Sequence, residues 1–234
     1  MLIFIMLLEH FKNHLWSIEY PNRRLGMKIR TRMTVIRLGD GSLFLHSPIP
    51  LTKQLQGRLE ILGPVRYVAS PNKFHHLFMG DYPRAYPNVR LYASPGLVEK
   101  RSDLRFQDVL RNSPEPEWKD DLDQTIFSVS WLMEEVIFFH RLSRTLILTD
   151  LGFHVPAQAP LILKVIAKMS GVYEKFGPAP FLKWTMNDRA AARQSFEKIL
   201  SWDLDRILIA HGPGIETNGK EVFRKAFQKI LNDS

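Results

Sequence analysis

The sequence predicts a single α/β domain that is β-rich in its first part and mixed α/β in its second. Its 234 residues suffice for one substantial hydrophobic core and are too few for two comfortable domains. Short apolar runs rich in β-branched residues predict buried strands, and segments with apolar residues at helical spacing predict helices between them. No internal repeat, low-complexity tract or linker divides the chain.

The first part of the chain predicts a hairpin, a helix and two more strands. Residues 34–38 and 42–46 flank the turn Gly39-Asp40-Gly41 and predict a β-hairpin. Leucines spaced as on one helix face predict a helix over 51–62, which Gly63-Pro64 ends. Strands are expected at 65–69 and 89–93. Each precedes a Ser-Pro pair, and the residue before a proline disfavours helical geometry.

The second part begins with a polar, acidic and proline-bearing stretch, residues 112–123, which predicts a surface excursion. Strands are then expected at 125–129, 135–140, 145–150 and 206–210. Helices are expected at 161–169, at 190–200 with Asn187 or Asp188 as its cap, and at about 220–231. This part of the chain is therefore expected to be mixed α/β.

Composition restricts the classes of function. At 45% hydrophobic and 24% charged residues the chain is typical of folded globular proteins. The absence of cysteine excludes a disulfide framework, iron–sulfur ligation and thiol catalysis, so any metal must be held by His, Asp or Glu. Small-molecule substrates, anionic ones included, remain compatible with this composition.

The net charge is +8, with a pI near 9.7, and it is concentrated at the N-terminal end. Residues 1–37 carry seven Lys/Arg and two Glu, which is +5 of the total. A solvated face is the first interpretation, and contact with nucleic acid, anionic lipid or an acidic substrate is the alternative. No RNA-binding signature or recognition-helix motif supports the nucleic-acid version.

The first eight residues are apolar, but a membrane span needs roughly 20 such residues. No Lys or Arg precedes them, as a secretory signal would require. We therefore expect a packing or interfacial segment, no transmembrane segment and a cytoplasmic location. Residues 1–33 are interpreted as a basic and apolar extension, and residues 34–234 as the domain. The sequence leaves the oligomeric state open.

Candidate metal ligands follow four of the predicted strands. They are His75 and His76 after 65–69, His140 at the end of 135–140, Asp150 at the end of 145–150, and His211 after 206–210. Strands of one sandwich can bring their ends to a common edge, so residues distant in sequence can converge there. Neutral imidazoles with one carboxylate suit zinc, iron, manganese or cobalt. The other histidines, His10, His14, His46 and His154, are expected to be structural, exposed or supporting residues.

Three segments carry a family resemblance: VRYVASPNKFHH (65–76), EVIFFHRLSRTLILTD (135–150) and RILIAHG (206–212). They resemble the metallo-β-lactamase superfamily and, more narrowly, a family of unknown-function proteins attached to it. The resemblance covers roughly residues 30–212, and FHRLSRTLILTDL is its most specific part. It implies a four-layer αββα sandwich with the site at the common edge of the two sheets.

The first superfamily motif, His-x-His-x-Asp-His, is altered in this chain. Pro71 and Lys73 stand in place of its first two histidines, His75 replaces its aspartate, and His76 is retained. The resemblance then leaves only His140 of one metal site. Of the other site it keeps His75, His76, Asp150 and His211. It implies a mononuclear site for one divalent metal, zinc first, with iron or manganese as alternatives.

The role of His140 stays open between ligand, supporting residue and core residue, since only nine residues separate it from Asp150. The expected function is a metal-dependent hydrolase of ester, lactone, thioester or phosphoester type. Asp150 would orient or deprotonate the attacking water, and Lys73 or Arg144 would stabilise developing negative charge. The alternative is a non-catalytic member of the superfamily with a degraded site and a basic binding surface.

Overall fold

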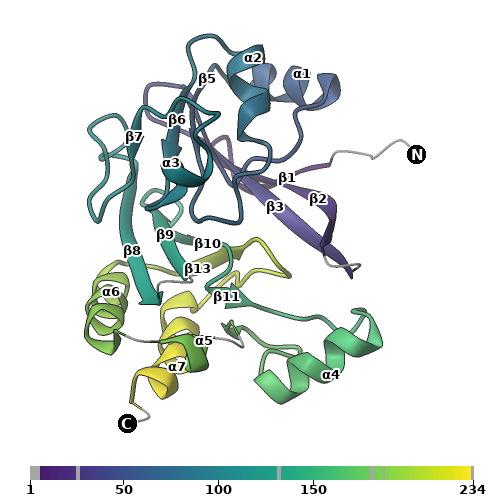
Figure 1. Cartoon of the computed structure of the whole chain (residues 1–234), viewed down its shortest axis with the longest axis vertical. Coiled ribbons are helices and arrows are strands. Elements are labelled where there is room, and N and C mark those ends of the chain that lie inside the picture. Colours follow the sequence, from purple (N-terminus) through teal and green to yellow (C-terminus); the bar gives the residue numbers. More distant parts are fainter. Residues whose placement is uncertain (1–5, 25–26, 131–132, 180–181, 187, 233–234) are drawn as a thin grey trace. The chain divides into compact units, whose positions relative to one another are not determined.

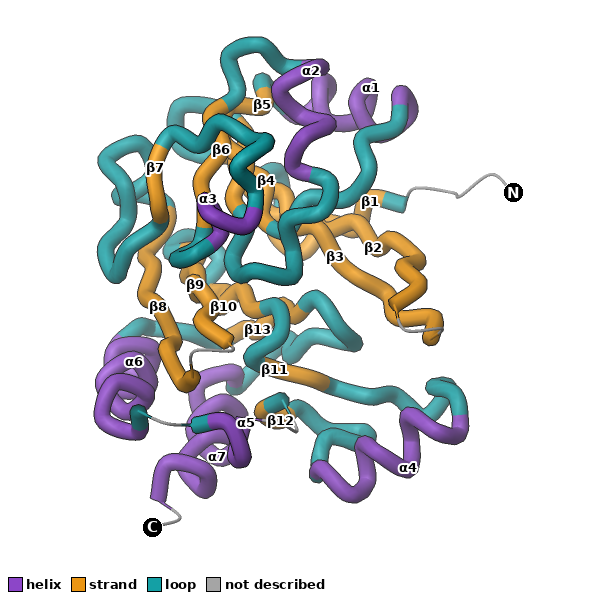
Figure 2. Tube along the Cα trace, in the orientation of Figure 1, coloured by secondary structure: helices purple, strands orange, loops and turns teal. Residues whose placement is uncertain are grey.

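The structure is a computed structural model that describes residues 6–24, 27–130, 133–179, 182–186 and 188–232 (Figure 1). Two compact units make up the chain. The first comprises Met1–Arg111 with Glu115–Asp121, and the second Asn112–Pro114 with Leu122–Ser234. Figure 2 distinguishes the strands, helices and loops of each unit. None of the described helices is long and apolar enough to cross a membrane.

The first unit is built on a mixed sheet that, in the described residues, has seven strands in chain order. They are β1 (Leu7–Phe11), β2 (Leu15–Arg24), β3 (Met27–Arg37), β4 (Leu43–His46), β5 (Val65–Ala69), β6 (Arg90–Ala93) and β7 (Asp108–Val109). Strands β1 to β4 pair antiparallel, and β4 to β7 pair parallel. The carboxyl ends of β4, β5 and β6 therefore lie at one edge of this sheet.

Short helices connect the parallel strands: α1 (Lys53–Leu62), the 3-10 turn η1 (Met79–Asp81), α2 (Tyr82–Ala85) and α3 (Leu97–Lys100). The hydroxyl of Thr52 accepts the N–H of Leu55 at 3.1 Å and so caps α1, which ends at Gly63. Leu55 and Leu59 are buried in one core with residues of β4 and β5. The predicted hairpin and the predicted helix are confirmed as β3–β4 and α1.

The expected boundary at residues 33/34 falls inside a continuous strand. β3 runs from Met27 to Arg37 and pairs with β2 along its whole length. Glu19 on β2 accepts hydrogen bonds from Arg30 at 2.8 Å and Arg32 at 2.7 Å, which places part of the basic N-terminal charge in ion pairs within the sheet. The described residues before 34 thus belong to the first sheet, because their apolar residues alternate with polar ones along paired strands.

The second unit is built on a sheet with the strand order β13-β10-β9-β8. Its strands are β8 (Leu122–Ser130), β9 (Met133–His140), β10 (Thr145–Leu148) and β13 (Arg206–Ile209), and a separate pair is formed by β11 (Gly152–Phe153) and β12 (Gly177–Pro178). β8, β9 and β10 pair antiparallel in succession, whereas β10 and β13 pair parallel. β8, β10 and β13 therefore end at one edge of this sheet, whereas β9 ends at the opposite edge.

In the part of this unit that the structure describes, the helices are α4 (Leu161–Ser170), α5 (Leu182–Thr185), α6 (Arg189–Ser201) and α7 (Gly219–Asn232). Asp188 caps α6 by accepting the N–H of Ala191, as predicted; the alternative cap, Asn187, lies outside the described residues. Phe223 and Phe227 of α7 pack in one core with Phe127 of β8, and α6 and α7 cover the sheet (Figure 1). This core holds β10 and β13 in place.

Candidate functional site

Asp150 and His211 lie side by side because of the register of two parallel strands. Leu148 of β10 is aligned with Ile209 of β13, and each candidate residue lies two positions further along. Oδ1 of Asp150 and Nε2 of His211 are 3.1 Å apart. Both side chains are mostly buried, with 12% and 13% of their surface exposed. The structure thus brings these two predicted ligands together.

The ring of His211 is held in a defined orientation. Phe153 of β11 stacks on it with a centroid distance of 5.3 Å and an interplanar angle of 19°. Gly212 follows with a φ of +121°, and a Cβ at this position would lie 2.0 Å from the carbonyl oxygen of His154. Only glycine fits there, which explains the His-Gly pair after β13 in physical terms.

Glu135 supports the loop that carries Asp150. It lies on β9 and is fully buried, and its carboxylate accepts the backbone N–H groups of Thr149, Asp150 and Leu151 at 2.6–2.9 Å. Burial first, and then the nearby Asp150 carboxylate, raises the pKa of Glu135 to about 7. Sequence reasoning missed this residue. Its signal was a glutamate at the start of an otherwise apolar strand, EVIFF.

The Asp150–His211 pair fits one zinc-type cation. Bond lengths near 2.0–2.2 Å and a tetrahedral angle place two ligand atoms of one zinc about 3.3–3.6 Å apart. The observed separation of 3.1 Å is close to this value, and a carboxylate with an imidazole is a common donor set for zinc, iron or manganese. Two residues alone are too few to hold a metal tightly, so further ligands are needed.

His75 lies in a buried turn of the first unit, at the carboxyl ends of the parallel strands. The side chain of Asn72 accepts the backbone N–H groups of Phe74 and His75 at 2.9 and 3.0 Å, which sets the turn. Nδ1 of His75 lies 2.7 Å from the hydroxyl oxygen of Ser47. Such a contact to one ring nitrogen fixes the ring plane, as is usual for histidines that bind metals through the other nitrogen.

His46 also lies at this edge, at the end of β4 and immediately before Ser47. It is buried, which agrees with the structural role that was one of the expectations for it. Burial first, and then neighbouring His75, lowers the pKa of His46 to about 3. Sequence reasoning did not connect His46 and Ser47 with the site, although they end the strand that pairs with β5.

His76 faces a different partner. Nη1 of Arg101 lies 3.1 Å from Nδ1 of His76 and donates to its carbonyl oxygen at 2.9 Å, while Arg101 also pairs with Asp103. A guanidinium can only donate, so Nδ1 accepts, and in a neutral ring the proton then resides on Nε2. This tautomer suits a hydrogen-bond donor better than a ligand, and a ligand role for His76 stays a prediction.

Lys73 packs against the beginning of α3. Its Nζ would lie 3.1 Å from a Cβ at Gly96, and its carbonyl oxygen accepts a hydrogen bond from Lys100 at 2.7 Å. The side chain is partly exposed. Its role towards a substrate stays a prediction.

His140 and Arg144 lie at the other end of the second sheet. β9 runs antiparallel to β10, so His140 pairs with Thr145 at the beginning of β10, whereas Asp150 follows its end. Nδ1 of His140 lies 2.7 Å from the hydroxyl of Ser143, and Arg144 pairs with Asp203 at 2.8 Å. The expectation that strand ends converge fails for His140, because antiparallel strands end at opposite edges. Arg144 precedes β10 and Asp150 follows it, so the two residues lie at opposite ends of this strand.

Residues 12–176 match the family model described as Domain of unknown function (DUF4336). No curated protein matches the chain.

Solved structures with the same fold share little sequence with this chain. A metallo-β-lactamase from Pontibacter korlensis has a TM-score of 0.65 and 10% identity, covering 98% of this chain and 100% of that one. The metallo-β-lactamase FIM-1 from Pseudomonas aeruginosa in its mono-zinc form has a TM-score of 0.61 and 9% identity, covering 97% and 96%. The metal-soaked Flv1 flavodiiron core from Synechocystis sp. PCC6803 has a TM-score of 0.64 and 11% identity, covering 98% and 61%. The chain therefore has the metallo-β-lactamase-like α/β fold, a single domain with two mixed sheets and helices.

Proposed function

Because this chain belongs to the DUF4336 family and has the metallo-β-lactamase-like fold, we propose that it is a metal-dependent hydrolase with a mononuclear site. The observation that carries the proposal is the Asp150–His211 pair, two mostly buried ligand types 3.1 Å apart at the edge where β10 and β13 both end.

Of the four ligands that the resemblance implies, we propose His75, Asp150 and His211, a set of residue types that can hold one divalent cation. His76 is not included, because its Nδ1 accepts from Arg101. Zinc is the first candidate, and iron or manganese are the alternatives. Three protein ligands leave a coordination position for water, which is the arrangement of catalytic rather than structural sites. The altered first motif, with Lys73 in place of a histidine, is the reason for proposing one metal ion rather than two.

When bound, such a cation supplies Lewis acidity for the attack of water on an acyl or phosphoryl centre. Asp150 accepts the proton of the attacking water on its carboxylate, which lies in a mostly buried site. Glu135 keeps the Asp150 loop in place through three backbone N–H groups. Phe153 and Ser47 keep the rings of His211 and His75 in their orientations. Esters, lactones, thioesters and phosphoesters are the substrate classes that this mechanism can hydrolyse.

Elemental analysis of protein purified without chelators tests the proposal. We expect about one equivalent of metal per chain, and its loss in Asp150→Asn and His211→Ala, because each variant removes a ligand. The partly exposed His14, changed to Gln, is the matched control and should keep the metal. Absence of metal after reconstitution, or metal content unchanged in both ligand variants, would contradict the proposal.

Activity separates the hydrolase from a non-catalytic member of the fold. A screen across carboxylic esters, lactones, thioesters and phosphodiesters should give at least one turnover that depends on the metal and disappears in Asp150→Asn. Metal binding without turnover on any of these substrate classes would instead favour the binding protein.

A further inference from the structure

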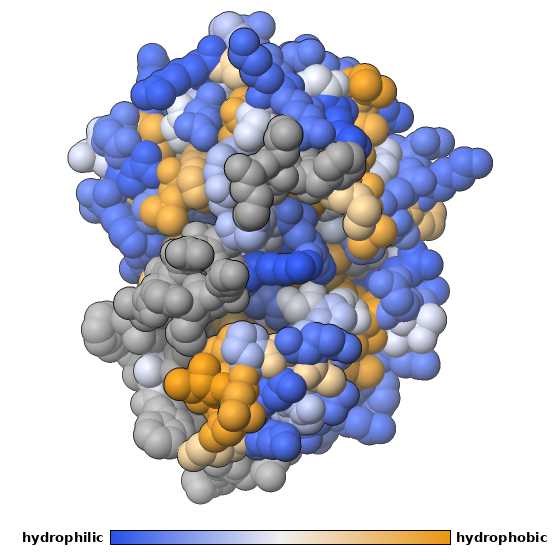
Figure 3. Space-filling model, turned by 90° about the vertical axis from the view of Figure 1, so that its right-hand side faces the viewer, coloured by the Kyte–Doolittle hydropathy of each residue, from blue (hydrophilic) through white to orange (hydrophobic). Residues whose placement is uncertain are grey.

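Helix α4 presents its apolar side chains outwards. Five large apolar residues of this ten-residue helix are exposed: Leu161 (77%), Ile162 (64%), Val165 (51%), Ile166 (46%) and Met169 (85%). Among the described residues only six other large apolar side chains are exposed, and they are scattered over the chain. Figure 3 shows the result as a hydrophobic patch over α4, with hydrophilic side chains along part of its border.

The orientation of α4 is the reverse of that expected for a helix on a globular protein, where the apolar face packs inwards. At 3.6 residues per turn the five exposed side chains span an arc of about 140°. Ala167, the buried residue of the helix, lies nearly opposite the centre of this arc. The helix therefore rests on the protein through its small residue and directs its large apolar residues away from it.

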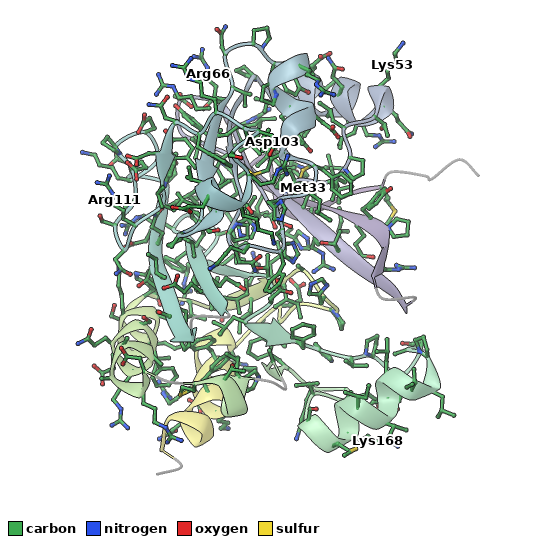
Figure 4. All side chains as sticks on the ribbon, in the orientation of Figure 1. Met33, Lys53, Arg66, Asp103, Arg111 and Lys168 are labelled. Carbon is green, nitrogen blue, oxygen red and sulfur yellow. The ribbon has the colours of Figure 1, made fainter. Side chains whose placement is uncertain are left out.

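The charged residues of α4 itself are both lysines. Lys164 and Lys168 lie together along one edge of the apolar arc, and no Asp or Glu occurs between Asp150 and Glu174. Lys168, labelled in Figure 4, extends its ammonium group over the ring of Tyr173, 5.0 Å from the centroid. Lysines beside an apolar face can keep their charge at the polar boundary while their stems cover apolar surface.

Hydrogen bonds join the two ends of the segment that carries α4. Val155 donates its N–H to the carbonyl of Val172 at 2.9 Å and accepts the N–H of Glu174 at 2.8 Å. The strands β11 and β12 pair just below, and Phe153 of β11 contacts His211. Helix α4 thus lies on a segment whose two ends are hydrogen-bonded to each other, and this segment begins next to the Asp150–His211 pair.

We propose that α4 is an interfacial helix that binds the surface of an anionic lipid bilayer. An amphipathic helix with exposed leucine, isoleucine and valine on one face and lysines at its border lies in the plane of the membrane interface, and its binding increases with anionic lipid. The charge pattern favours this partner, because an anionic surface complements the two lysines as well as the apolar arc. The proposal requires no metal and no hydrolase activity.

Vesicle co-sedimentation of the full chain tests it, with vesicles of phosphatidylcholine alone and of phosphatidylcholine with about one third phosphatidylserine. We expect the chain to bind the phosphatidylserine vesicles more tightly, by about fivefold for each lysine at the surface. The variant Lys164→Gln with Lys168→Gln should lose most of this preference. The variant Ile162→Asp with Met169→Asp should lose binding to both vesicles by about tenfold or more.

The matched control is Ile61→Asp with Leu142→Asp, which adds the same charge at apolar side chains that are 82% and 55% exposed elsewhere in the chain. It should bind vesicles as the unchanged protein does.

Three results would overturn the proposal. The first is vesicle binding that is absent, or that the α4 variants leave unchanged. The second is a dimer in light scattering that Ile162→Asp with Met169→Asp dissociates, since a second copy would then cover the patch. The third is a Tm that falls by several degrees more in this variant than in the control, because the patch would then be covered by the chain itself.

Discussion

Nε2 of His211 lies 3.1 Å from Oδ1 of Asp150, although 61 positions separate the two residues in the sequence. Their proximity follows from the parallel pairing of β10 with β13, in which Leu148 is aligned with Ile209. Asp150 comes two positions after Leu148, and His211 comes two positions after Ile209. Both side chains therefore lie at the same edge of the sheet.

Removal of the Glu135 carboxylate should destabilise the protein. Glu135→Ala leaves three backbone N–H groups without the acceptor that they now share, and we expect the free energy of unfolding to fall by about 3 kcal/mol or more. Urea denaturation of the metal-free protein measures this. Glu134→Ala, at the partly exposed neighbour, should cost much less. Equal losses in the two variants would refute the assigned role of Glu135.

His140 and His211 should differ in their effect on metal content. His211→Gln should remove the bound metal, whereas His140→Gln should retain it, because antiparallel β9 ends at the opposite edge from Asp150. Both variants are compared by elemental analysis after identical purification. Metal loss in His140→Gln with an unchanged Tm would show that this histidine is a ligand after all.

Ser47→Ala should weaken metal binding without removing any ligand. The hydroxyl of Ser47 lies 2.7 Å from Nδ1 of His75, and loss of such a contact weakens metal affinity by about 10–100-fold. A competition titration with a chromophoric chelator measures the affinity. Ser195→Ala, which removes a buried and hydrogen-bonded hydroxyl on α6, is the control and should leave the affinity unchanged.

His46 should make the protein sensitive to acid. Burial lowers its pKa from 6.5 in the unfolded chain to about 3 in the folded one, so the unfolded chain binds more protons between these values. The stability that His46 contributes is thus present above about pH 6.5 and is lost as the pH falls towards 3, by roughly 3 kcal/mol between pH 6.5 and 4.

The measurement is the free energy of unfolding from pH 7 to pH 4 for His46→Leu, which cannot take up this proton. The variant should lose less stability over that range than the unchanged protein, while His14→Gln should follow the unchanged protein. A pH profile of His46→Leu that runs parallel to that of the unchanged protein would disprove the assignment.

Local pattern was sufficient to locate many of the strands and the longer helices. The strand at Val65–Ala69 and the cap at Asp188 were predictable because a short apolar, β-branched run and a capping side chain are properties of neighbouring residues. Strands β1 and β2 were not anticipated, since their apolar and basic residues were interpreted as an extension. Pairing with β3 gives β2 a buried face on which its apolar residues pack. Pairing between strands is not a property of neighbouring residues, so it could not be predicted locally.

The residues that are chemically able to hold a metal can be identified from the sequence: they are histidines and aspartates at the ends of apolar strands, in a chain without cysteine. Which of these residues lie close together depends on the directions of the strands in the folded sheet. Asp150 meets His211 because β10 and β13 run parallel, and His140 is directed to the far edge because β9 runs antiparallel. Strand direction depends on how the connections pack on the sheet, and the same local pattern is compatible with either direction.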